Sequence, residues 1–199
     1  DGTLGSTYTT QLPDGFRRTM ATLNSDVYVN TDSTIVGRTM ANADIGTVLQ
    51  HIKSLTFADL GATAGPTGGS MRDGITLLLY SSYVNGTTRL GAHNNHIQVD
   101  FGNPGNAVLG GPVTGGMLNK WGNGVLLLAD PTNSYNLGSV VNAQGVNTAT
   151  SILGSLTRTG TPFGTGPIYV NPGAQLRIAD PSNIATNAVN VLSEIGRAH

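Results

Sequence analysis

Histidine pairs and carboxylate clusters are the side chains best suited to bind metals or transfer protons, and this sequence has few of either. The closest histidine pair is His93 and His96, which are separated by two asparagines. Two histidines at this spacing share one face of a helix, but the segment has the composition of a loop that enters a strand, where an odd spacing places them on opposite faces. Asp100 follows on the same strand and does not complete a site without a third ligand. We interpret His93–His96 as a surface loop and predict no metal site.

The carboxylates are dispersed along the chain. Asp130 and Asp180 each precede a proline, and because Asp-Pro initiates turns, we interpret both as structural. Enzymes that cleave polysaccharides need clustered carboxylates, or a carboxylate beside arginine and lysine. Since residues distant in sequence could meet in the fold, a polysaccharide lyase or glycoside hydrolase remains an alternative to a non-catalytic protein.

Two Gly-x-Gly pairs, Gly122–Gly124 and Gly164–Gly166, superficially resemble phosphate-binding loops. Neither is expected to open a helix, and neither is followed by Lys-Ser/Thr or by the downstream acid of a nucleotide site. Aspartate also does not follow Gly-x-Gly at the offset of the calcium-binding nonapeptide. We therefore predict no cofactor.

Three aromatic residues, Trp121, Tyr135 and Tyr169, raise the question of a carbohydrate site. An exposed row of aromatic rings could bind glycans. The alternative is that the rings cap a stacked core or lie on a strand face, and we favour this second interpretation.

The composition favours strands and turns. The chain has 199 residues, of which 38% are hydrophobic and 11% charged, with a net charge of −1, so no basic surface indicates a nucleic-acid partner. Lysine and glutamate, which favour helices, are nearly absent, whereas glycine is abundant, with 28 residues. There is no cysteine, which excludes disulfides and thiolate metal sites, and no apolar run approaches the length of a membrane-spanning helix. We expect an all-β protein that does not span a membrane.

Short apolar runs between Gly, Pro and Asn turns predict the strands. The expected strands are 26–30, 33–37, 52–58, 74–81, 87–90, 96–101, 125–129, 138–142, 151–157, 167–171 and 174–179. Two further stretches are expected to be helical, Ile45–Ser54 and Ile184–Ile195, the second because Pro181-Ser182-Asn183 is a helix-start signal.

A strand followed by Val-Asn and then glycine recurs along the chain, as in "VNAQG" at 141–145 and "VNPG" at 170–173. Recurrence at tens of residues is typical of stacked coils, in which glycine and asparagine tolerate the positive φ of a corner and a stacked asparagine can bond the backbone of the adjoining coil. The predicted corner residues are Gly122, Gly124, Asn142, Gly145, Asn171 and Gly173. The predicted core residues are Leu118, Leu126, Leu128, Val141, Val170, Leu176 and Ile178.

One long segment resembles a known repeat. Leu118-Asn119-Lys120-Trp121-Gly122-Asn123-Gly124 with Val125–Leu128, then "NSYNLG" at 133–138 and Val141-Asn142, resembles the autotransporter-associated β-strand repeat. The segment "FGTGPIYVNPGAQLRI" at 163–178 is similar to the linking part of that repeat. The resemblance covers about residues 109–178. Segments 52–57 and 87–103 resemble degenerate members, and the first fifty residues match poorly.

The resemblance implies a right-handed parallel β-helix, with a short helical or irregular segment near one terminus. Its expected organisation is an irregular or divergent β segment at 1–50, solenoid repeats at 51–180, and a turn, helix or linker at 181–199. It also implies an extracellular or cell-surface passenger segment of a bacterial protein, without catalytic residues.

The expected function is a structural fibre, with adhesion as a further role and neighbouring repeats, other copies of the chain and surface glycans as expected partners. Because the ends of such a stack expose strand edges, head-to-tail assembly into a filament is one hypothesis. We also expect the chain to be a fragment or a processed piece of a longer protein. The alternatives are a glycan-binding or glycan-cleaving β-helix and a trimeric phage tail-fibre segment.

Overall fold

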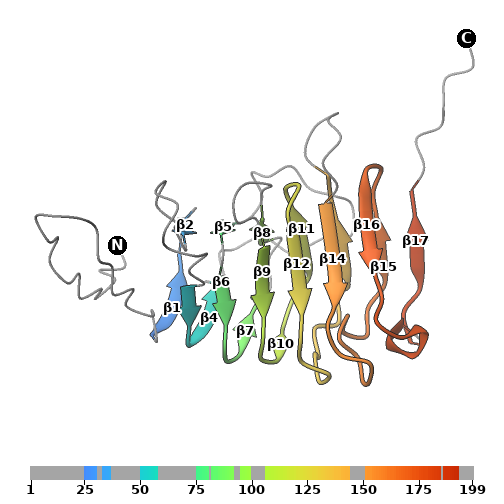
Figure 1. Ribbon diagram of the computed structural model, residues 1–199, viewed down its shortest axis with the longest axis horizontal. Coiled ribbons are helices and arrows are strands. Elements are labelled where there is room, and N and C mark those ends of the chain that lie inside the picture. The colour runs from blue at the N-terminus through green and yellow to red at the C-terminus, as the bar shows by residue number, and fades with distance from the viewer. Residues whose placement is uncertain are drawn as a thin grey trace, which may run out of the picture.

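The chain folds as a β-solenoid in which short parallel strands stack along one axis (Figure 1). The computed structural model describes residues 25–30, 33–36, 50–57, 75–80, 82–91, 95–99, 106–143, 151–184 and 186–192. Within these ranges the helical structure is limited to one 3₁₀ helix, η1 (Pro181–Ile184). The prediction of an all-β solenoid is confirmed.

Three parallel sheets form the sides of the solenoid. The four-stranded sheet has the order β1 (Asp26–Val29), β4 (Ser54–Phe57), β7 (Thr88–Arg89), β10 (Val113–Thr114). The seven-stranded sheet has the order β17 (Val189–Val191), β15 (Ile168–Val170), β13 (Ser139–Val141), β11 (Leu118–Trp121), β8 (His96–Gln98), β5 (Thr76–Tyr80), β2 (Ser33–Val36). The six-stranded sheet has the order β16 (Ala174–Arg177), β14 (Ser151–Ser155), β12 (Val125–Leu128), β9 (Asn106–Leu109), β6 (Ser82–Val84), β3 (Gln50–Ile52). One circuit of the chain around the axis is called a coil below.

Coil length varies while the sheets stay in register. Asn106 pairs with Val125, 19 positions along the chain, whereas Ser33 pairs with Leu77, 44 positions along. The described strands have only two to five residues, so the difference lies in the number of residues between them. The structural unit is therefore a set of short strands, one in each sheet, that keep their pairing while the number of residues between them varies.

The solenoid extends beyond the predicted limits of 51–180. Strands β1 and β2 lie before residue 51 and pair in parallel with β4 and β5. Beyond residue 180, β17 pairs in parallel with β15. The β segment expected at 1–50 thus includes two strands of the stack, and pairing can add a coil even where the repeat motif is weak.

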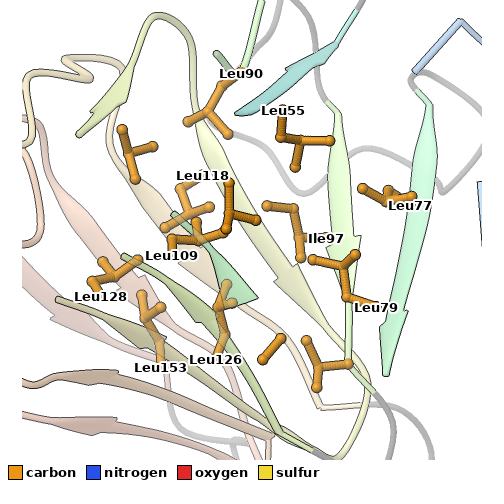
Figure 2. Packing of buried hydrophobic residues seen from close by; sticks show 14 of the residues in the cluster. Leu55, Leu77, Leu79, Leu90, Ile97, Leu109, Leu118, Leu126, Leu128 and Leu153 are labelled. Atoms are coloured by element: carbon orange, nitrogen blue, oxygen red, sulfur yellow. The ribbon is translucent and has the colours of Figure 1, made fainter. Parts of the chain in front are cut away.

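Inward-facing aliphatic side chains fill the space between the three sheets. Figure 2 shows Leu55, Leu77, Leu109, Leu118, Leu126 and Leu153, among others, contributed by strands of all three sheets. Of the predicted core, five residues are buried: Leu118, Leu126, Leu128, Val141 and Val170. Leu176 is partly buried against the core. Ile178 was wrongly assigned to the core, since it is 38% exposed. It directly follows β16, which is the edge strand of its sheet among the described residues, so the side chain lacks a neighbouring coil on one side.

The structure contradicts both predicted helices. Within Ile45–Ser54, residues 50–52 form β3 and Ser54 begins β4; positions 45–49 lie outside the described residues. Within Ile184–Ile195, η1 ends at Ile184 and Val189–Val191 form β17. Pro181 does begin a helical turn, but pairing with β15 then determines the conformation of the chain, because parallel pairing outweighs a weak local preference for helix.

Candidate functional site

Most of the predicted corner residues lie at one edge of the solenoid, between the seven-stranded and six-stranded sheets. We call this edge the asparagine corner. Gly122 and Gly124 connect β11 to β12, Asn142 follows β13, and Asn171 with Gly173 connects β15 to β16. Gly145 lies outside the described residues.

Two of these glycines have the backbone conformation expected of a corner. Gly122 has a φ of 77° and Gly173 a φ of 76°, in the left-handed region that side chains disfavour. Gly124 has no left-handed φ and contributes in another way. Its N–H donates to the carbonyl of Val99 at 2.6 Å, and its carbonyl accepts from Ile152 N at 3.2 Å, so it joins the coils before and after it.

The asparagines of this corner stack on each other. Asn171 Nδ2 donates a hydrogen bond to Asn142 Oδ1 in the preceding coil. Their backbone N–H groups also donate to the preceding coil. Asn142 N donates to the carbonyl of Lys120 at 2.9 Å, and Asn171 N donates to the carbonyl of Val141 at 3.0 Å. We predicted an asparagine side chain that bonds the backbone of the adjoining coil, whereas this bond runs to the side chain of the equivalent asparagine.

Lys120 lies inside the solenoid beside this corner, although a lysine is seldom found in a core. Its side chain has 0% exposure, and its strand position is paired with Ile97 on one side and Val141 on the other. Nζ donates to Ser151 Oγ at 2.9 Å, to the carbonyl of Val99 at 3.4 Å, and to the carbonyl of Gly122.

The three acceptors of Lys120 belong to successive coils. Val99 follows β8, Gly122 follows β11, and Ser151 begins β14. One amine therefore bonds three coils at the point where each turns from one sheet to the next. Because Lys120 and Ser151 both have 0% exposure, a substrate in solvent has no access to this Lys–Ser pair. The Lys120 amine, which could act as a base or nucleophile in another setting, here donates hydrogen bonds that join successive coils.

A second set of asparagines, which the sequence did not reveal, bonds coils near the four-stranded sheet. Asn95 Oδ1 accepts from Ile75 N at 3.0 Å, and its Nδ2 donates to the Leu90 carbonyl at 2.7 Å. Asn133 Oδ1 accepts from Val113 N at 2.7 Å. Each acceptor lies 20 positions after its donor. That spacing, about one coil, is the sequence signal that could have identified them.

The three aromatic residues do not form one exposed platform. Tyr135 is fully buried, and burial raises the pKa of its phenol, although the hydrogen bond to Ser139 Oγ at 2.9 Å acts in the opposite direction. Trp121 and Tyr169 lie half-buried on the outward side of the seven-stranded sheet. Trp121 packs edge-on against His96, with ring centroids 5.6 Å apart.

The remaining candidates for chemistry are also placed by the structure. His96 is 1% exposed at the start of β8, so its assignment to a surface loop was wrong; His93 and Asp100 lie outside the described residues. Asp130 Oδ1 accepts from Thr132 N at 2.7 Å within a turn, and Asp180 directly precedes η1. Within the described ranges there is no group of three or more His, Cys, Asp or Glu residues that could hold a metal ion.

Neither Gly-x-Gly pair opens a helix. Gly124 leads into β12, and Gly166 is followed by β15 after one residue. No helix in the part of the chain that the structure describes is long and apolar enough to cross a membrane. Comparison with protein-family models, with curated proteins and with solved structures finds no match for this chain.

Proposed function

We propose that this chain is a non-catalytic structural segment of a bacterial cell-surface or secreted protein, in which it acts as a rigid spacer. The observation that carries the proposal is the engagement of Lys120, whose amine bonds three successive coils. The asparagines at both edges are used in the same way. Polar groups that would serve catalysis elsewhere serve here to hold coils in register.

The backbone arrangement supports a spacer as well. Parallel strands of successive coils are hydrogen-bonded along the solenoid axis, so a pull along that axis loads these bonds and the inward aliphatic contacts of every coil. Each added coil lengthens the body by about 4.8 Å, the spacing of hydrogen-bonded strands. Length is thus set by coil number, independently of the residues on the outer faces.

The test is a replacement in the parent protein. Substituting this segment by an unrelated solenoid of the same coil number is expected to preserve surface display and the function of the flanking regions. Deleting the segment is expected to impair that function by shortening the spacer. Loss of function on the equal-length replacement would contradict a spacer, because it would require information specific to these residues.

A second assay addresses the glycan-cleaving alternative. The purified chain, incubated with a panel of acidic and neutral polysaccharides, is expected to release no new reducing ends and no unsaturated products. Release of either would support the lyase or hydrolase and overturn the structural proposal.

A further inference from the structure

The outward face of the six-stranded sheet carries no formal charge along most of its length. Its outward positions form two columns that run from coil to coil. The first column is His51, Tyr83, Val108, Leu127 and Gly154, and the second is Asn106, Val125 and Ile152. Between β3 and β14 these described positions include no Asp, Glu, Lys or Arg. A face of this composition is suited to an uncharged partner.

An aromatic pair lies in the first column. The ring centroids of His51 and Tyr83 are 5.6 Å apart and the ring planes are tilted by 35°. Both side chains are half-buried, so part of each ring is in contact with solvent. The Tyr83 ring extends over the next coil, because a Cβ on Gly110 would overlap it. The glycine therefore allows the tyrosine to lie along the sheet, where it offers ring surface to a ligand.

The rest of the first column is levelled in the same way. Leu127 lies over Gly154 of the next coil, where an added Cβ would be 2.9 Å from Leu127 Cδ2. Since large side chains lie over glycines of neighbouring coils, the face has a flat surface without high ridges.

Amide side chains lie beside the aromatic pair. Asn85 is exposed, and its Oδ1 is 3.3 Å from His51 Nδ1. Asn106 is also exposed and lies on β9, two residues before Val108, the partner of Tyr83. An amide both donates and accepts hydrogen bonds, which matches the hydrogen-bonding capacity of a hydroxyl group.

We infer that this face binds a neutral polysaccharide, whose sugar rings stack on His51 and Tyr83 while the amides of Asn85 and Asn106 bond its hydroxyls. The C–H groups of a sugar ring are weakly positive, and the face of an aromatic ring is negative, so the two attract each other. An uncharged glycan also loses no charge solvation on an uncharged face.

Two other occupants fit the face less well. A second copy packed sheet on sheet would need side chains that interdigitate, whereas Tyr83 and Leu127 lie down over glycines. A lipid surface attracts proteins through basic residues beside the apolar ones, and these two columns have no lysine or arginine between β3 and β14.

Calorimetric titration of the 199-residue chain tests the inference. The probes are soluble oligomers of β-1,4-linked glucose and of N-acetylglucosamine, with an oligogalacturonate as the acidic counterpart. The neutral oligomers are expected to bind and the acidic one to bind more weakly. Tyr83→Ala should lower the affinity at least about tenfold, whereas Tyr83→Phe, which keeps the ring, should retain most of it.

Tyr169→Ala is the matched control. Tyr169 is also a half-buried tyrosine, but it lies on the outward side of the seven-stranded sheet, so its loss should leave the affinity unchanged. Gly110→Ala keeps the aromatic and amide side chains and displaces the Tyr83 ring, so it should weaken binding as well. Circular dichroism establishes that each variant is folded.

Several outcomes would overturn the inference. They are no binding of a neutral oligomer up to millimolar concentration, stronger binding of the acidic oligomer, and equal affinity in Tyr83→Ala. Dimers in sedimentation that Tyr83→Ala dissociates would assign the face to a second copy, and Tyr83-dependent binding to phosphatidylcholine vesicles would assign it to lipid. The spacer role is judged separately, by replacement in the parent protein, because it depends on coil number and not on these outward residues.

Discussion

Val141 and Val191 are the same residue type in the same inward-facing column, two coils apart, and their burial differs completely. Val141 has 0% exposure, whereas Val191 has 73%. Strand β13 is paired on both sides, with β11 and β15, and β17 is paired with β15. In a solenoid, burial is thus a property of the neighbouring coil more than of the residue. Central coils should be rigid and sensitive to substitution, and end coils tolerant.

The largest effect is expected at the most central polar residue. Lys120→Ala should lower the free energy of unfolding by about 4 kcal/mol, because it leaves a cavity and removes the donor for three buried acceptors. Trp121, the single tryptophan, adjoins it and reports unfolding by fluorescence in denaturant. Lys120→Met, which keeps most of the volume, should cost about half as much. Equal losses for both variants would indicate that the hydrogen bonds alone matter.

The second prediction tests the opening comparison directly. Val141→Ala should cost about 2 kcal/mol through a cavity enclosed on both sides. Val191→Ala should cost at most about 0.5 kcal/mol, since its side chain is largely in solvent. Urea unfolding of each variant gives both values. Similar costs at the two positions would show that the last coil is covered in solution.

A smaller effect is expected from the asparagine corner. Asn171→Ala should cost about 1 kcal/mol, the contribution of one partly buried hydrogen bond to Asn142. Asn190→Ala, on the exposed strand β17, is the control and should leave the free energy of unfolding nearly unchanged. Thermal unfolding followed by circular dichroism compares the two variants, and a larger loss from Asn190→Ala would contradict the stacking of Asn142 and Asn171.

The smallest effect concerns the exposed pair Asp26 and Lys53, which joins the first coil to the second. The hydrogen bond from Ser54 Oγ to Asp26, at 2.6 Å, and then that from Lys53, lower the pKa of the Asp26 carboxyl below its ordinary value of 3.8. The stabilisation is therefore complete above pH 3.8 and is lost as the pH falls through the lower pKa of the folded chain. Carbon NMR titration should show that Ser54→Ala raises this pKa more than Lys53→Met does. The reverse order would make the lysine the main cause.

Short apolar runs between turn residues were sufficient to predict many of the strands, and the recurring Val-Asn-Gly unit, with the resemblance to a repeat family, predicted the solenoid. In Val125–Leu128 the sequence is apolar throughout, and the structure buries Leu126 and Leu128 and half-covers Val125 and Leu127. The strands that escaped prediction, such as β10 and β11, are short or include Asn and Lys. Their conformation depends on paired neighbours, which a local pattern does not contain.

The polar interior was less accessible to prediction. Lys120 was recognised as part of a repeat motif, but its burial depends on acceptors from Val99 and Ser151, which lie far from it in sequence. The same holds for Tyr135, which was considered for an exposed row and lies in the core. A polar side chain points inward only where other coils supply its hydrogen-bond partners, and those partners come together only when the coils stack.

The unequal length of the coils has a practical consequence for engineering. Pairing tolerates separations from 19 to 44 positions, and closing a longer connection adds little entropic cost, about 0.6 kcal/mol for each doubling of its length. A foreign peptide inserted between β13 and β14, after Ala143, should therefore be carried on the side of the rod without disturbing its assembly. Epitopes or enzymes inserted at successive connections would then be displayed at regular intervals along the solenoid axis.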